Sequence, residues 1–351
     1  MKLKKLEINH FRGVKHFELD LCPEDDTPNS LNCLLGNNGS GKTTVLQAIA
    51  LVLSAATRTN EDIASLQNSG FSSLSWKGFI YERGVSRSTK IKLALELEPD
   101  EIMAVQEIFE IWKHYYPNHS FRLTKPDEQT DINLLYEFGQ IKCLEGEAAL
   151  FELCGRFLVK TVAEVLSFSE VRNFLVRMGD VFWFEQSRHL ITSSEEAVTS
   201  IRQELVNWWA YHHQNHKNGE DLLVELESAF KIIFPNTQFV GIEPMKFKDS
   251  VNQVNFYLLL QRGDSKPYDI EEMSSGEQTI FSILYQFVSL RIARSIILLD
   301  ELELHLHPPQ QQAFYTSLYK FGPDCQFITT THSHYLEDVF LRKERFLMEI
   351  L

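Results

Sequence analysis

The chain has 351 residues, of which 44% are hydrophobic and 23% charged, and its formal net charge is −14 at pH 7. This composition is ordinary for a folded protein of one large or two ordinary domains, and no apolar run approaches the roughly 18 residues of a membrane span. Because an acidic surface repels phosphate backbones on average, contact with nucleic acid would require a local basic patch.

The N-terminus and the cysteines favour a cytoplasmic protein. The stretch MKLKKLEINHF carries basic residues without the apolar core of a secretory signal. Five cysteines, at positions 22, 33, 143, 154 and 325, are scattered without a CxxC pair. This set is typical of reduced thiols and offers no framework for zinc.

The first hundred residues predict strands around one buried helix. The apolar pattern of residues 2–21 predicts an antiparallel pair of strands that turns near Arg12 and Gly13. NCLLG is a short apolar strand, Thr43 to Ala56 has the spacing of a buried helix, and residues 90–97 alternate as a strand.

The remainder of the chain predicts a helical stretch followed by alternating strands and helices. We expect mainly helix from Pro99 to about Val176, and the other predicted elements are strands at 181–184, 238–243 and 252–261 and helices at 194–233 and 277–293. SIILLD and CQFITTTH are short apolar strands of the kind that is buried in a mostly parallel sheet.

A phosphate-binding loop lies between the strand NCLLG and the helix that follows it. Gly36 to Thr43 reads GNNGSGKT and matches GxxxxGK[ST], whose backbone N–H groups wrap a phosphate at the positive end of a helix. Lys42 would reach the β- and γ-phosphates, and the Thr43 hydroxyl would bind Mg²⁺. The residues expected to contact the nucleotide here are Asn37, Asn38, Gly39, Ser40, Gly41, Lys42, Thr43 and Thr44.

A second apolar strand ends in acids, in the stretch LLDELELHLHPPQQQ. In a nucleotide site, Asp300 would hold Mg²⁺ and Glu301 would act as the general base on the attacking water. A metal site built on His305 and His307 is the alternative interpretation, although no third and fourth ligands stand at a suitable spacing.

Two further short motifs are weak evidence alone, but their order and spacing relative to the phosphate loop and the acidic pair are informative. Ser274, Ser275, Gly276 and Glu277 precede a helix, so their hydroxyls and amides lie at its positive end. Thr331-His332-Ser333 closes the strand QFITTT.

Together these motifs resemble the ABC-type ATPases, in the branch of RecF, the SMC-like proteins and the OLD-family ATPases. Residues 300–308 are similar to the family's extended Walker B and D-loop, with Leu302 in place of the usual proline, and MSSGEQ resembles the LSGGQ signature. THS matches the switch-histidine loop, with His332 near the γ-phosphate, and IxxFRG places Arg12 near the nucleotide.

The resemblance implies an α/β fold, an ABC-type P-loop NTPase head with a mostly parallel sheet, an antiparallel N-terminal sheet and a helical insertion. The implied domains are a first ATPase lobe at 1–98, the insertion at 99–180 and a second lobe at 181–351. The glutamine that senses Mg²⁺ would be Gln186, with Gln140 as the alternative, and His305 and His307 would belong to the D-loop.

The family works as a homodimer, in which the signature of one subunit completes the ATP site of the other. The resemblance therefore implies ATP hydrolysis with ATP and Mg²⁺ as cofactors, although no residue distinguishes ATP from GTP. Only 19 residues follow His332, so we expect no Toprim nuclease domain. Because no apolar run is long enough for a membrane span, we also expect no membrane partner.

Two biological roles remain open from the sequence. One is a regulatory or scaffold subunit of an antiphage defence or toxin-type system, which controls a separate effector protein such as a nuclease or toxin. The other is a RecF-like DNA repair factor that clamps duplex DNA, for which KLKK at 2–5 and RGVSRSTKIK at 83–92 supply the basic segments.

Overall fold

The computed structural model describes residues 1–22, 26–57, 85–117, 130–137, 140–185, 195–213, 221–245, 256–301, 306–336 and 338–348. The chain divides into two compact units. Unit 1 comprises Met1–Phe184, Arg291–Glu301 and Gly322–Leu351, and unit 2 comprises Glu185–Leu290 and Leu302–Phe321. The lobe boundaries expected at 98 and 180 stay a prediction.

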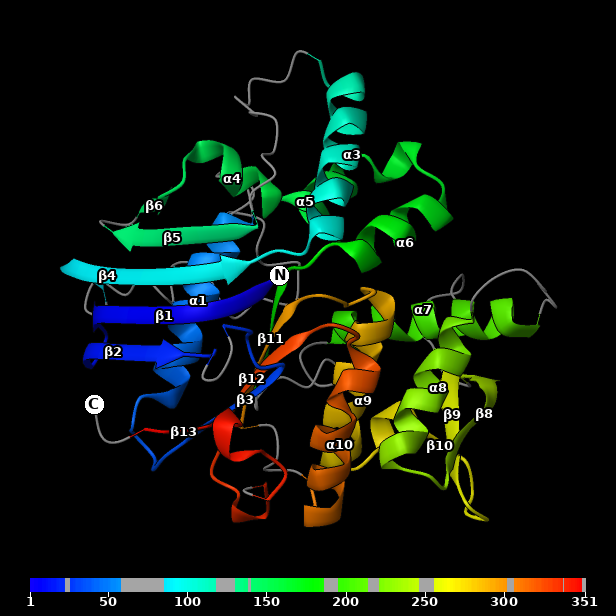
Figure 1. Cartoon of the computed structure of the whole chain (residues 1–351). Coiled ribbons are helices and arrows are strands. Elements are labelled where there is room, and N and C mark those ends of the chain that lie inside the picture. Colours follow the sequence, from blue (N-terminus) through cyan, green and yellow to red (C-terminus); the bar gives the residue numbers. More distant parts are fainter. Residues whose placement is uncertain are drawn as a thin grey trace. The chain divides into compact units, whose positions relative to one another are not determined.

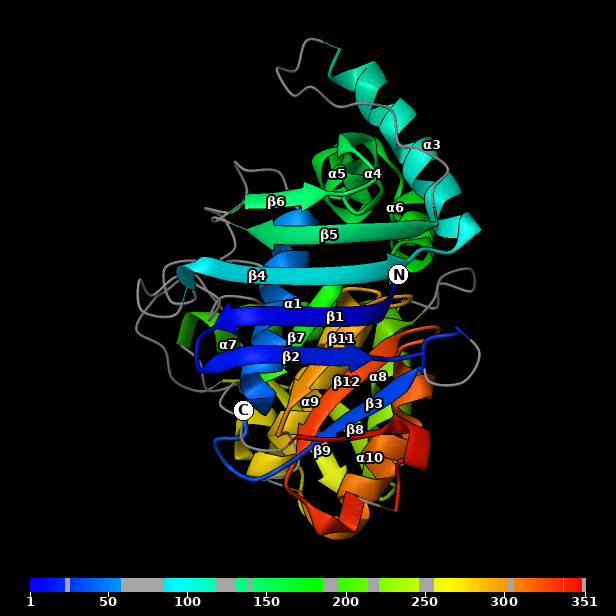
Figure 2. The same cartoon turned by 60° about the vertical axis from the view of Figure 1, so that its left-hand side comes forward.

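Unit 1 contains two five-stranded sheets, one antiparallel and one parallel where its pairings are described (Figures 1 and 2). The antiparallel sheet has the order β2-β1-β4-β5-β6, with β1 Lys2–Phe11, β2 Val14–Asp20, β4 Val85–Glu96, β5 Asp131–Glu137 and β6 Gln140–Cys143. The second has the order β13-β3-β12-β11-β7, with β3 Leu31–Leu35, β7 Val181–Glu185, β11 Ile296–Asp300, β12 Gln326–Thr331 and β13 Arg345–Leu347.

The hairpin expected at the N-terminus is confirmed. β1 and β2 pair antiparallel down to Phe11 opposite Val14, so the chain turns at Arg12 and Gly13. Arg12 adopts a φ of 54°, the left-handed conformation that such a tight turn requires.

The two apolar strands expected in a parallel sheet are also confirmed. β11 pairs parallel with β12, and β12 pairs parallel with β3. Every residue of β12 is buried, as are the first four of β11. A strand that is buried on both faces reads as a continuous apolar run, as β11 does, whereas β12 also buries Gln326 and three threonines.

Helix α1, Lys42–Ala56, lies between the two sheets of unit 1. It contacts β1, β4 and β5 of the antiparallel sheet and β11 and β12 of the parallel sheet, and it crosses the strands in both views (Figures 1 and 2). Its apolar residues face both sides, and Val45, Leu46, Ile49 and Leu53 are fully buried in one core with both sheets. A helix that is apolar all round is stable only when it is enclosed in this way.

The segment expected to be a helical insertion mixes helices and strands. Its helices are α3 Pro99–Tyr115, α4 Glu147–Glu152, α5 Gly155–Thr161 and α6 Phe168–Arg177, and α3, α5 and α6 share a separate apolar core. Between α3 and α4, the strands β5 and β6 extend the antiparallel sheet. The prediction of a mainly helical segment did not include these two strands.

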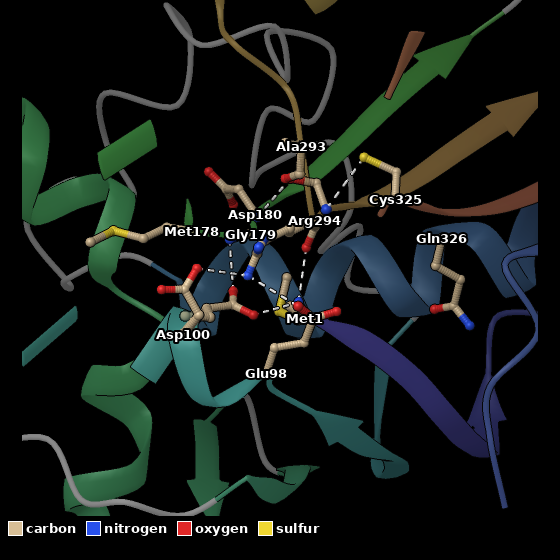
Figure 3. Close-up of polar contacts among 12 residues, drawn as sticks. Met1, Glu98, Asp100, Met178, Gly179, Asp180, Ala293, Arg294, Cys325 and Gln326 are labelled. Carbon is tan, nitrogen blue, oxygen red and sulfur yellow. Dashed lines mark hydrogen bonds and ion pairs between the residues drawn. The ribbon is translucent and has the colours of Figure 1, made fainter. Parts of the chain in front are cut away.

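A polar cluster joins α3 to the strands of unit 1 at their amino ends, as Figure 3 shows around Met1, Gly179 and Arg294. The buried Glu101 carboxylate accepts hydrogen bonds from the Met1 amine at 2.5 Å and from Gly179 N at 2.7 Å. Arg294 forms ion pairs with Glu98 at 3.0 Å and Asp100 at 3.1 Å. A Cβ at Gly179 would lie 2.3 Å from the Arg294 carbonyl oxygen, so only glycine permits this approach.

The described residues of unit 2 form four α-helices and one three-stranded sheet. Its elements are α7 Glu195–His213, α8 Leu222–Ile233, β8 Thr237–Pro244, β9 Phe256–Arg262, β10 Tyr268–Asp269, α9 Ser275–Ser289 and α10 Pro308–Phe321. α8 contacts α7, α9 and α10, and Phe230 and Phe281 pack edge to face in its core with ring centroids 6.0 Å apart. Within the described part of the chain, no helix combines the length and the apolar character that crossing a membrane requires.

Candidate functional site

The phosphate loop connects β3 to α1, as the sequence predicts. Gly39 and Gly41 have φ angles of 81° and 91°, a conformation that residues with a Cβ rarely adopt. Gly41 is the residue that precedes α1, so the left-handed turn there sets the N–H groups of the first helical turn toward the loop. The expected contact residues from Asn37 to Thr44 all lie on this loop and the first turn of α1.

Lys42 is enclosed at the centre of the loop, and its side chain is 4% exposed. Its ammonium donates to the carbonyl oxygens of Gly36 at 2.9 Å and Asn37 at 3.0 Å. His332 Nε2 lies 2.9 Å from the same nitrogen, and Glu301 Oε1 lies 3.9 Å from it. The lysine and histidine assigned to the phosphate site therefore meet in the folded chain.

Three hydroxyl and carboxylate groups join the loop to β11 and β12. Thr43 Oγ1 donates to Asp300 Oδ1 at 3.1 Å, and Thr330 Oγ1 donates to the same oxygen at 2.6 Å. The site analysis of the sequence missed Thr330, because a threonine inside a buried strand carries no functional pattern. The one feature that could have indicated Thr330 is its position, two residues before His332 on a strand that pairs with β11.

Glu301 follows the end of β11 with a φ of 50°. Its backbone N–H donates to Thr330 Oγ1 at 3.1 Å and to the Thr330 carbonyl at 3.3 Å. Its carboxylate Oε1 lies 2.5 Å from His332 Nε2. The left-handed backbone costs a residue with a Cβ on the order of 1 kcal/mol, and this cost is met where surrounding contacts fix the conformation.

The oxygen donors fit Mg²⁺. The Thr43 hydroxyl and the Asp300 carboxylate already share a hydrogen bond, so one hard cation could contact both. Mg²⁺ in nucleotide sites takes only one or two protein ligands beside phosphate and water. Over the described ranges, no group of three His, Cys, Asp or Glu gathers that could hold a metal ion alone.

Of the other predicted site residues, the structure describes Arg12 and Gln140. The Arg12 guanidinium donates to Gln47 Oε1 on α1, and burial lowers its pKa from the usual arginine value. Gln140 begins β6, at the edge of the antiparallel sheet, and Gln186 lies outside the described residues.

Of the two histidines in the predicted D-loop, the structure describes only His307. His305 lies outside the described residues, whereas the His307 carbonyl accepts hydrogen bonds from Gln310 N at 2.8 Å and Gln311 N at 3.0 Å at the start of α10.

The signature residues begin helix α9 in unit 2. Ser274 precedes the helix and forms a capping box with Glu277, while Ser274 and Ser275 are exposed. The Glu277 carboxylate is buried and accepts from Tyr268 at 3.1 Å, from Ser274 N at 3.0 Å and from Arg262. Burial pushes the pKa of Glu277 up, but the bonds from Ser274 and Arg262 outweigh it, so the pKa is lowered. Glu277 thus supports the loop that presents Ser274 and Ser275.

Comparison with known families agrees with this geometry. A family described as "AAA ATPase domain" matches residues 1–239, and a second, described as "AAA domain, putative AbiEii toxin, Type IV TA system", matches residues 183–338. The chain belongs to the AAA ATPase domain family. The resemblance to ABC-type ATPases of the RecF, SMC-like and OLD branch is confirmed.

Two curated proteins are similar over nearly the whole chain, and a third over less than half of it. Septu protein PtuA of Bacillus mycoides is 23% identical over 94% of this chain and 38% of its own length. OLD nuclease of Thermus scotoductus is 25% identical over 96% of this chain and 60% of its own length. The Retron Ec83 probable ATPase of Escherichia coli is 36% identical over 43% of this chain and 35% of its own length. The chain therefore spans less than two thirds of each of these relatives.

The fold is that of an SMC head. The structure described as the SmcHead bound to the C-winged helix domain of ScpA aligns with a TM-score of 0.54 at 13% identity, covering 98% of this chain and 96% of that one. The expected ABC-type head, with one sheet mostly parallel and the other antiparallel, is confirmed.

Proposed function

We propose that this chain binds and hydrolyses ATP with Mg²⁺. The observation that carries the proposal is the convergence of five side chains in unit 1: Lys42, Thr43, Asp300, Glu301 and His332. They come from the carboxyl ends of the adjacent strands β3, β11 and β12, the edge at which open α/β sheets bind their ligands.

Each of these residues has a role that its position supports. Backbone N–H groups of the loop hold the phosphates, and Lys42 exchanges its carbonyl contacts for the β- and γ-phosphate oxygens. Glu301 accepts a proton from the attacking water, and His332, which lies beside it, donates to the γ-phosphate oxygen. Thr43 and Asp300 would hold Mg²⁺, which would supply positive charge against the charge that develops on the transferred phosphate.

The hydrolysing species in this proposal is a homodimer. Ser274, Ser275 and Gly276 stand at the N-terminus of the 15-residue helix α9, where the positive end of the helix and the exposed residues Ser274 and Ser275 favour an anion. The signature of one copy would contact the γ-phosphate held by the other. Because the nucleotide then bridges two surfaces, dimerisation depends on ATP and is reversed by hydrolysis.

For the biological role, we favour a regulatory or scaffold subunit that controls a separate effector such as a nuclease or toxin. The toxin–antitoxin description of the family over residues 183–338 and the similarity to a retron ATPase support this role. The net charge of −14 suits a protein partner better than DNA.

A DNA repair role is the second candidate, favoured by a 71-residue match at 39% identity to the "DNA replication and repair protein RecF" of Lactococcus lactis. Four of the basic residues proposed for DNA form ion pairs with carboxylates: Lys4 with Asp26 and Asp131, Lys5 with Asp20, Lys90 with Glu137 and Lys92 with Glu7. Since these acids offset the charge of the four lysines, these lysines attract a phosphate backbone less than unpaired ones would.

Two variants test the ATPase proposal. Lys42→Ala should lose nucleotide binding, measured with a fluorescent ATP analogue, because the Lys42 ammonium supplies positive charge at the loop centre. Glu301→Gln should bind ATP with near wild-type affinity while its phosphate release falls at least about 100-fold, the usual scale for a general base. Retained turnover in Lys42→Ala would remove the assignment of the phosphate loop.

A gel-shift experiment with the ATP-loaded Glu301→Gln variant separates the two roles. We expect no salt-sensitive shift of duplex DNA. Tight binding that weakens steeply with salt would favour the repair role over the effector role.

A further inference from the structure

Thr330 occupies a place in the site that the family motifs do not assign. Its hydroxyl makes two hydrogen bonds at once, donating to Asp300 Oδ1 at 2.6 Å and accepting from Glu301 N at 3.1 Å. It is fully buried in β12 and lies directly opposite Asp300 in the parallel register of β12 and β11. One hydroxyl therefore contacts both acidic residues of the site.

The two bonds fix different properties of the acidic pair. The bond to Asp300 fixes the rotation of the carboxylate that also accepts from Thr43, so the oxygen offered to a cation has one orientation. The bond from Glu301 N contributes to holding a backbone whose φ is 50°. Without it, the residue that carries the general base would be less constrained, because left-handed backbone is unfavourable for glutamate.

The neighbouring threonines do not share this position. Side chains alternate faces along a strand, so Thr329 and Thr331 point away from the face that Thr330 shares with Asp300. Thr329 Oγ1 contacts the Thr330 carbonyl at 3.4 Å, and Thr331 Oγ1 accepts from Ser333 N at 2.9 Å. Thr329 is as buried as Thr330 and of the same type, so it provides a matched control.

We propose that Thr330 is a positioning residue of the Mg²⁺–nucleotide site, orienting Asp300 for the cation and Glu301 for the attacking water. The inference rests on the proposed ATPase function and extends it. Residues that orient a metal ligand without touching the metal commonly change metal affinity or activity about 10- to 100-fold when their hydrogen bond is removed.

The test measures binding of a fluorescent non-hydrolysable ATP analogue while Mg²⁺ is titrated. Thr330→Val keeps the shape of the side chain and removes its hydroxyl. We expect its affinity for the analogue in EDTA to stay within about 3-fold of wild type, and the Mg²⁺ concentration for half-maximal tight binding to rise at least about 10-fold. Thr330→Ser, which restores the hydroxyl, and Thr329→Val should both stay within about 3-fold in Mg²⁺ dependence.

The outcomes distinguish this inference from the function on which it rests. Suppose that wild type binds the analogue in a Mg²⁺-dependent way. If Thr330→Val then needs the same Mg²⁺ concentration for half-maximal binding as wild type, the positioning role is overturned while the ATPase proposal stands. The same holds if Thr329→Val raises that concentration as much as Thr330→Val does. If wild type binds no analogue, both fail. Should Thr330→Val not fold, Thr330→Cys supplies the same comparison, since a thiol donates only weakly to Asp300.

Discussion

At the scale of single residues, the site depends on carboxylates that are held by several donors. Asp300 accepts two hydroxyls through one oxygen, and Glu277 accepts from Ser274, Tyr268 and Arg262. Glu277 is buried and Asp300 half-buried, and a carboxylate removed from water costs free energy unless its oxygens are paired, so both acids depend on these donors. The two acids serve different ends, because Asp300 faces the phosphate loop whereas Glu277 braces the start of α9.

The Glu277 network predicts a pH-dependent stability for unit 2. Because the pKa of Glu277 is lowered in the folded chain, its contribution is fully present above the ordinary value of 4.5 and is lost as the pH falls through the lowered pKa. Glu277→Gln should reduce the free energy of unfolding by about 1–2 kcal/mol at pH 7, from the weakened cap and ion pair.

Thermal unfolding followed between pH 7 and pH 3.5 checks this prediction. The difference between wild type and Glu277→Gln should shrink toward the acid end, because protonation makes the two side chains alike. Glu243→Gln, which removes the charge of an exposed glutamate on β8, serves as the control and should change stability by less than about 0.5 kcal/mol. A constant difference at every pH would contradict the proposed ionisation.

At the scale of elements, one buried arginine on α5 ties together two distant parts of unit 1. Arg156 donates to the carbonyl of Met178, at the end of α6, at 3.5 Å and to that of Arg291 at 3.2 Å. Its guanidinium also lies over the Phe182 ring, 5.4 Å from the centroid. Met178 stands just before the chain leaves unit 1, and Arg291 is the residue at which it re-enters.

Arg156→Met should therefore destabilise unit 1 by about 2–3 kcal/mol, since two carbonyl groups lose their donor inside the protein. Arg156→Lys should be intermediate, because an ammonium lacks the fork that reaches both carbonyls. Urea unfolding measures the effect, with Lys160→Met on the exposed face of the same helix as the control. If Lys160→Met lowered the free energy of unfolding as much as Arg156→Met does, the role of the guanidinium would be contradicted.

The sequence predicts elements best where the pattern is local. The phosphate loop, α1 and the buried strands β11 and β12 follow from spacing and apolar runs within a few residues. β5 and β6 were missed because they are defined by distant pairing, β5 with β4 and β6 with β5. Within a segment rich in helix, that pairing leaves only a brief alternation in the sequence. Thr330 was missed for a similar reason, since its role appears only when β11 and β12 are aligned.

At the scale of the whole molecule, the proposed function requires two copies. In the presence of ATP and Mg²⁺, Glu301→Gln should sediment with the mass of two 40.7 kDa chains, and without nucleotide with the mass of one. Adding Ser275→Arg at the exposed start of α9 should return the mass to one chain, because a bulky cation blocks close approach of a second phosphate loop.

Two controls make that measurement specific. The Ser275→Arg chain should still bind the fluorescent ATP analogue, since its own phosphate loop lies in unit 1. Thr316→Arg, an equal change on the exposed side of α10, should leave the ATP-dependent dimer intact. A dimer that persists in Ser275→Arg would show that the signature lies outside the interface.

The order of strands in the parallel sheet has a consequence for synthesis of the protein. β3 pairs with β12 and with β13, both of which are encoded after all of unit 2. During synthesis, β3 and the apolar helix α1 are therefore exposed until β12 and β13, which pack against them, have been translated. Strand pairings between residues so distant in sequence form slowly and leave hydrophobic surface exposed in the meantime. We therefore expect the nascent chain to depend on chaperones more than other chains of this length do.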